Sequence, residues 1–193
     1  NWIQDNIKKV DKATNGKVGY IYIPDMGPEG LNEFARYFYP QLDKEGLIID
    51  DRANGGGNVS PMILERLSRE PYRLTMGRGT SHVGTVPDAV QVGPKVCLIN
   101  KYSASDGDLF PWGFRALGLG KLIGTRTWGG IVGISGSLPY MDGTDIRVPF
   151  FTSYDPKTGK WIIENHGVDP DILIDNDPVK EWNGEDQQLN RAI

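Results

Sequence analysis

The 193-residue sequence contains a single cysteine, Cys97, and only two histidines, His82 and His166. One cysteine excludes an internal disulfide, and its place in an apolar run favours a buried thiol over a reactive one. Two histidines beside one cysteine give no zinc pattern, so we expect no metal and no other cofactor. The formal net charge of −4, without a basic block, argues against a nucleic-acid partner.

Long hydrophobic runs are also missing. No apolar stretch reaches the roughly 20 residues needed to cross a bilayer, and there is no signal peptide. We therefore expect no membrane partner. The missing signal says little about the parent protein, for which we favour a cytoplasmic over a periplasmic location. The sequence begins at Asn1 without an initiating Met, which indicates a processed chain or an excised domain. Its length suits one large domain with a substantial core.

Hydrophobic periodicity predicts strands that alternate with helices in the first half of the chain. Strands are expected at residues 18–24, 46–51, 72–76, 95–99, 121–124 and 172–174, and helices at 2–14, 30–42, 60–68, 109–117 and 187–193. This alternation is typical of an α/β fold with parallel strand pairs. Farther along, Asp142-Gly143 predicts a hairpin turn, and residues 150–154 and 161–164 are expected to form two paired strands. We predict a mostly parallel sheet with antiparallel hairpin additions.

Small hydroxyl residues lie where the strand at residues 95–99 gives way to the next helix. Ser105 stands there, followed by Asp106 and Gly107. Backbone N–H groups at the start of a helix have no helical acceptor, and with the helix dipole they stabilise a developing oxyanion. Ser105 is therefore a candidate nucleophile, although Ser and Asp in this position are also the commonest plain N-caps.

A second motif, Asp51-Arg52-Ala53-Asn54-Gly55-Gly56-Gly57, also follows a buried strand. Successive glycines present backbone N–H groups without side chains in the way, which suits an oxyanion hole, a phosphate cradle or simply a flexible turn. A P-loop is excluded because no Gly-Lys-Ser/Thr follows. Ligand sites of parallel sheets gather at the carboxyl ends of strands, so Gly57 and Ser105 would face one crevice if their strands are neighbours.

Taken together and in order, these motifs resemble the C-terminal core domain of tricorn-type proteases, which belong to the tail-specific, carboxy-terminal-processing serine peptidases. The motifs that carry the resemblance are residues 51–57, 100–108, 118–130 and 164–171. The match extends over nearly the whole chain from Gly19 and implies a layered α/β fold of the crotonase/ClpP type. It divides the chain into residues 1–16, a helical linker from an absent upstream domain, and residues 17–193, the peptidase core.

The resemblance also implies the site residues and the substrate. Ser105 would be the nucleophile, and the backbone N–H groups of Gly57 and Asp106 would form the oxyanion hole. Glu164 would be the acidic member that orients the base through a neighbouring hydroxyl. Taken alone, Glu164 is typical of a solvated carboxylate at a strand end. The implied activity is serine-type hydrolysis of peptides.

The general base departs from the family pattern. Processing-type members use a lysine in the passage that here reads Thr127-Trp128-Gly129-Gly130, where glycine replaces it. Tricorn-type members use a histidine on a helical domain upstream of a PDZ domain. His82 does not match that position, and His166 is an alternative base only because it flanks Glu164. We therefore expect the upstream PDZ and helical domains to be partners that supply the base, the chain alone to be weakly active or inactive, and the parent protein to form a hexamer.

Two other functions fit the same fold. A non-catalytic peptide- or ligand-binding module would not need the Ser105-Asp106 pair beside Gly57. An acyl-CoA enzyme of crotonase type also uses paired backbone N–H groups. The sequence favours the serine peptidase over both.

Overall fold

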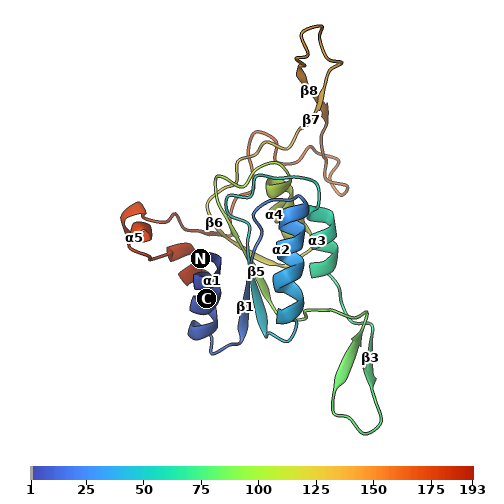
Figure 1. Ribbon diagram of the computed structural model, residues 1–193, viewed down its shortest axis with the longest axis vertical. Helices are drawn as coiled ribbons and strands as arrows, with labels where there is room; N and C mark the ends of the chain where they lie inside the picture. The colour runs from blue at the N-terminus through green and yellow to red at the C-terminus, as the bar shows by residue number, and fades with distance from the viewer. Residues whose placement is uncertain (1) are drawn as a thin grey trace.

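A five-stranded sheet forms the centre of the computed structural model, which describes residues 2–193 (Figure 1). In spatial order its strands are β1 (Val18–Tyr22), β2 (Gly46–Asp50), β5 (Lys95–Ile99), β6 (Gly120–Gly124) and β9 (Ile172–Leu173). Every neighbouring pair is parallel. The carboxyl ends of all five strands therefore lie at one edge of the sheet, where the loops that follow them meet.

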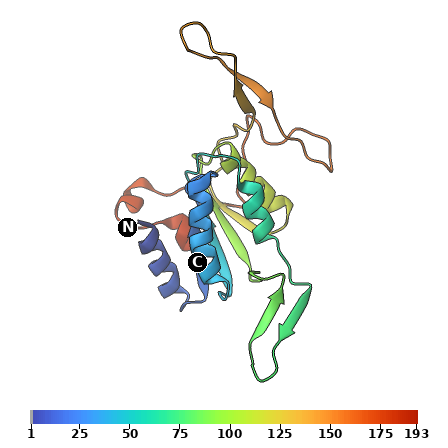
Figure 2. The same ribbon diagram turned by 45° about the vertical axis from the view of Figure 1, so that its right-hand side comes forward.

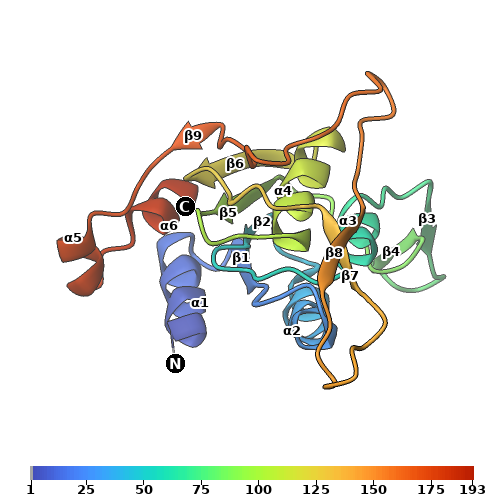
Figure 3. The same cartoon turned by 90° about the horizontal axis from the view of Figure 1, so that it is seen from above.

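Helices cover both faces of this sheet (Figure 3). On one face lie α2 (Pro28–Phe38), α3 (Ser60–Leu67) and α4 (Asp106–Ala116), and on the other lie α1 (Trp2–Ala13) and α6 (Gln187–Ala192). Two shorter helices are η1 (Tyr39–Gln41) and α5 (Pro178–Trp182). Within residues 2–193, no helix is both long enough and apolar enough to span a bilayer.

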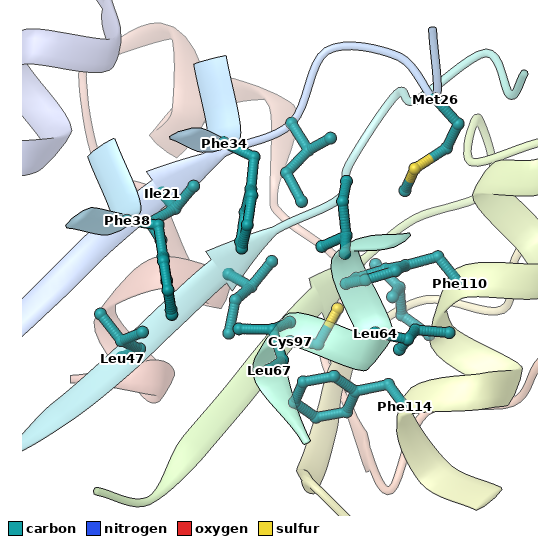
Figure 4. Close-up of a cluster of buried hydrophobic side chains, with 14 of the residues drawn as sticks. Ile21, Met26, Phe34, Phe38, Leu47, Leu64, Leu67, Cys97, Phe110 and Phe114 are labelled. Atoms are coloured by element: carbon teal, nitrogen blue, oxygen red, sulfur yellow. The ribbon is translucent and has the colours of Figure 1, made fainter. Parts of the chain in front are cut away.

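Each face of the sheet has its own buried cluster, because successive strand residues point to opposite faces. The cluster under α2, α3 and α4 includes Ile21, Ile49, Cys97, Phe34, Phe38, Phe110 and Phe114 (Figure 4). The cluster under α1 and α6 includes Tyr20, Ile48, Leu98, Ile123, Val10 and Leu189. Burial on both faces explains the nearly continuous apolar runs of the central strands. The expectation of a buried thiol at Cys97 is confirmed.

Two antiparallel hairpins project from opposite ends of the molecule (Figures 1 and 2). One pairs β3 (Arg73–Met76) with β4 (Val83–Val86), and the other pairs β7 (Gly133–Gly136) with β8 (Arg147–Phe151). The predicted α/β fold, a mostly parallel sheet with antiparallel hairpin additions, is confirmed.

One predicted pair of strands near the end of the chain is wrong. Residues 150–154 and 161–164 are not two paired strands, because β8 pairs with β7 and Tyr154 meets Trp161 only through a single bridge. The predicted hairpin turn at Asp142-Gly143 is confirmed, because it lies between β7 and β8, with Gly143 at φ 84°. The Gly-Ile-Ser-Gly sequence of β7 has a single β-branched residue between glycines, which are depleted in strands, so it gives little strand signal.

A buried ion-pair network joins both ends of the chain to the sheet. Asp50, at the end of β2, accepts from Arg52 Nε at 2.8 Å and from its Nη2 at 2.6 Å. The Tyr20 hydroxyl donates to Asp50 Oδ2 at 2.6 Å, and Asn6 of α1 donates to that hydroxyl at 3.0 Å. Arg52 Nη1 also donates to Asp186, the N-cap of α6, at 3.0 Å. The terminal helices are thus held by hydrogen bonds as well as by apolar packing.

Candidate active site

Ser105 occupies the turn between β5 and α4, at the carboxyl edge of the sheet. Its backbone has φ 57° and ψ −120°, which costs a non-glycine residue about 1–3 kcal/mol. Ser105 is exposed and stands at the N-cap position of α4, yet its side chain makes no capping hydrogen bond. The plain-cap alternative is therefore not realised. A sharp, strained strand-to-helix turn is a geometry that presents a nucleophilic hydroxyl.

The glycine loop that follows β2 lies against this turn. A Cβ on Gly56 would come within 2.6 Å of the Ser105 Cβ, so only glycine allows the two backbones to approach this closely. Met26 holds the same loop from the other side, because its N–H donates to Gly56 O at 2.9 Å and its O accepts from Asn58 N–H at 2.7 Å. Between these contacts Gly57 has φ 151°, and a Cβ there would overlap Met26 O.

Two backbone N–H groups beside Ser105 are unused. Within residues 2–193, neither Gly57 N–H nor Asp106 N–H donates a hydrogen bond to the protein. The strands that precede them, β2 and β5, are neighbours, and Ala104 N–H donates to Asn54 O at 2.8 Å. The structure therefore brings together three of the residues singled out from the sequence. Two unpaired N–H groups beside a hydroxyl have the layout of an oxyanion hole.

Glu164 lies on a neighbouring loop and is half-buried. Its Oε2 accepts from the N–H groups of Ile131 and Val132, at 2.6 and 2.9 Å. The two preceding N–H groups donate to Asp108 of α4, at 2.7 and 3.3 Å. Residues 129–132 thus place four successive N–H groups on two carboxylates, which connects the loop beside Glu164 to the helix that Ser105 begins. Glu164 is not the solvated carboxylate that its position in the sequence suggested.

Asp108 is not among the site residues predicted from the sequence. It is buried, and its burial raises the pKa of the carboxyl, opposed by hydrogen bonds from the Thr127 hydroxyl and from backbone N–H groups. Nothing in the sequence distinguishes Asp108, because an acidic residue in the first turn of a helix is common for electrostatic reasons.

In the part of the chain that the structure describes, neither histidine is hydrogen-bonded to Ser105. His82 is exposed at the turn of the β3–β4 hairpin, at the end of the molecule opposite β7–β8 (Figure 1). His166 has its Nε2 3.6 Å from Asp169 Oδ2, and it shares a groove with Trp112 in the second half of α4. His166 Nδ1 lies 2.8 Å from Gly167 O, so both ring nitrogens face groups other than Ser105. Within residues 2–193, no group of three or more His, Cys, Asp or Glu side chains could hold a metal.

Asp51 lies fully buried beneath the glycine loop. Burial and the Asp50 carboxylate raise the pKa of Asp51 well above its usual range, partly opposed by the Asn54 amide. A carboxyl whose pKa is raised by folding contributes less stability as the pH rises above its unfolded value of about 4. We predict that Asp51→Asn changes the free energy of unfolding more favourably at pH 7.5 than at pH 4.5, because only the wild-type carboxyl loses stability over that range. Urea denaturation of both proteins at both pH values measures the change in the free energy of unfolding. An equal change at pH 4.5 and pH 7.5 would contradict the prediction.

The chain resembles known proteins over nearly its whole length. Residues 17–174 match peptidase family S41. The tricorn protease of Thermoplasma volcanium is 45% identical over 195 residues, covering 100% of this chain and 18% of that protein. Tricorn protease homolog 1 of Streptomyces coelicolor is 36% identical, again over 100% of this chain and 18% of the relative.

The fold of the chain is also similar to that of a solved structure. A crystal structure of the tricorn protease superposes with a TM-score of 0.91 at 42% identity, covering 99% of this chain and 18% of that one. The resemblance to tricorn-type proteases is therefore confirmed, while this chain spans less than a fifth of the length of those relatives. The chain belongs to peptidase family S41.

Proposed function

We propose that this chain is the catalytic core of a serine peptidase and that Ser105 is its nucleophile. The observation that carries the proposal is the Ser105 hydroxyl, which makes no capping hydrogen bond and lies beside the unpaired N–H groups of Gly57 and Asp106. Ser105 Oγ attacks the carbonyl carbon of the scissile peptide bond, and the carbonyl oxygen takes the negative charge. The two N–H groups donate to that oxyanion, the amine leaves with the proton taken from Ser105, and water then hydrolyses the acyl-enzyme.

Glu164 has the role of orienting the general base through a neighbouring hydroxyl. Its Oε2 is engaged by the backbone of Ile131 and Val132, whereas its Oε1 has no protein donor within residues 2–193. A carboxylate fixed through one oxygen can direct a hydrogen bond with the other, which restricts the base to a productive orientation.

The base itself comes from outside the 193 residues. Within the described residues no histidine lies beside Ser105, and glycine stands where a catalytic lysine would be needed. Residues 1–16 then connect the core, residues 17–193, to upstream helical and PDZ domains that carry the base histidine. Relatives in which the matching segment is 18% of the length have room for such domains. Assembly of the longer protein into a hexamer belongs to the same proposal.

Hydrolysis of a fluorogenic peptide by the 193-residue chain and by the longer protein that contains it tests this assignment. We expect the isolated chain to be slower by a factor of about 10³ or more, because removal of one triad member costs about 10⁴. A fluorophosphonate probe should label Ser105 in the longer protein, with mass spectrometry as the readout. Ser105-dependent turnover by the chain alone would show that a base lies within it. Peptide binding without hydrolysis by the longer protein would instead support a binding module.

A further inference from the structure

The carboxylate of Asp106 makes a contact that the proposed reaction does not use. It is buried and accepts from the backbone N–H of Ser60 at 2.9 Å through Oδ2, and from the Ser60 hydroxyl through Oδ1. Ser60 is the first residue of α3 and is itself only 3% exposed. One carboxylate therefore joins the N-terminal ends of α3 and α4.

Part of this contact is helix capping. Val59 is the N-cap residue of α3 and makes no side-chain capping bond, so the Asp106 carboxylate serves in its place. A negative charge near two helix N-termini is also electrostatically favourable. Capping alone, however, would not require the acceptor to come from the residue that follows the candidate nucleophile.

The contact also links the two chain segments that carry the unpaired N–H groups. Ser60 stands three residues after Gly57, and its acceptor is the side chain of Asp106, whose own N–H is the second donor. On the far side of the loop, Met26 O accepts from Asn58 N–H at 2.7 Å. The segment from Gly57 to Ser60 is therefore fixed from two directions, and the Asp106 contact sets its separation from α4.

We propose that Ser60 and the Asp106 carboxylate are positioning residues of the oxyanion hole, an inference that rests on the proposed serine-peptidase function. Donors stabilise an oxyanion when they are held about 2.7–3.1 Å from the position that it will occupy, without rearrangement during the reaction. The oxyanion exists only near the transition state, so loosening the Ser60–Asp106 contact reduces kcat and leaves KM nearly unchanged.

The test uses the longer protein with Ser60→Ala and Asp106→Ala. Each is expected to lower kcat by a factor of about 10–100, with KM within about twofold, since complete loss of one donor costs about 10²–10³. Binding of a peptidyl trifluoromethyl ketone, whose adduct carries an oxyanion, should weaken by the same factor as kcat/KM. Asp106→Asn should restore most of the rate, because its amide oxygen accepts from Ser60 N–H and its nitrogen donates to the Ser60 hydroxyl.

Ser68→Ala is the matched control. Ser68 is the C-cap residue of the same helix, and its hydroxyl donates to Glu65 O at 3.1 Å. We expect unchanged kinetics in this variant, and thermal unfolding of all variants separates lost activity from lost fold. A kcat within about twofold of wild type in both Ser60→Ala and Asp106→Ala, or a loss confined to KM, overturns the inference. Full activity in Ser105→Ala would overturn the proposed function instead.

Discussion

Replacing Ser105 with alanine is expected to lower the rate of peptide hydrolysis by the longer protein by a factor of about 10⁴–10⁶. The substitution removes the attacking oxygen but leaves both unpaired N–H groups. These groups can then stabilise only the oxyanion that forms when water attacks the peptide bond directly, which is slow. Initial rates with a fluorogenic peptide measure the loss, and the fluorophosphonate label should disappear with the activity. Ser81→Ala is the matched control, because Ser81 is exposed near the turn of the β3–β4 hairpin.

Ser105→Gly separates the chemical role of this residue from its structural cost. Glycine tolerates the backbone angles of φ 57° and ψ −120° that strain Ser105. This variant should therefore be as inactive as Ser105→Ala, yet about 1 kcal/mol more stable than the alanine variant in urea denaturation. Such a result would show that backbone strain at the turn is maintained for the position of the hydroxyl. Activity that persists in both variants would contradict the assignment of the nucleophile.

The central sheet could be predicted from the sequence because its strands are buried on both faces. Runs such as Leu47-Ile48-Ile49 are typical of interior strands. Gly16 and Gly118 mark the ends of α1 and α4. The β7–β8 hairpin could not be predicted in the same way. Trp161 and Phe150 look like core residues in the sequence but are 72% and 76% exposed. Their hydrophobicity therefore does not report burial within this domain.

Part of the candidate site could also be predicted from the sequence, and part could not. Ser105 and Gly57 could be paired from the sequence because each follows a strand, and the carboxyl ends of adjacent parallel strands share one edge. The contact between Ser60 and Asp106 could not, because it joins residues 46 positions apart on two different helices. The backbone contacts of Glu164 likewise depend on how a long loop folds back. Local patterns predict which residues follow a strand, whereas contacts between loops and helices require the tertiary structure.

Replacing Arg52 with methionine should lower the free energy of unfolding by about 3–5 kcal/mol, because it leaves buried carboxylates without their counter-charge. Asp50 is 0% exposed, and its two oxygens accept from Arg52 at 2.8 and 2.6 Å. Asp186 loses the same partner, so the anchor of α6 weakens as well. At about 2–4 °C per kcal/mol for a domain of this size, the melting temperature should fall by roughly 10 °C.

The acid side of the stability profile gives a second measure of the same network. Burial acts to raise the pKa of Asp186, but the hydrogen bonds and charge of Arg52 outweigh it and lower the pKa overall. A carboxyl with a lowered folded pKa contributes stability above its unfolded value of about 4 and loses it as the pH falls through the folded pKa. Wild-type protein should therefore lose more stability between pH 6 and pH 3 than Arg52→Met, as followed by urea denaturation.

Arg126→Met provides the contrast for both measurements. Arg126 pairs with Asp169 at 2.7 Å, but both side chains are about half exposed, at 55% and 51%. Water and salt screen such a pair, so its loss should change the free energy of unfolding by less than about 1 kcal/mol and leave the acid profile unaltered. Equal destabilisation by the two variants would mean that burial of the Arg52 network has no energetic consequence. A wild-type acid profile in Arg52→Met would show that Asp186 does not depend on Arg52 for its charge.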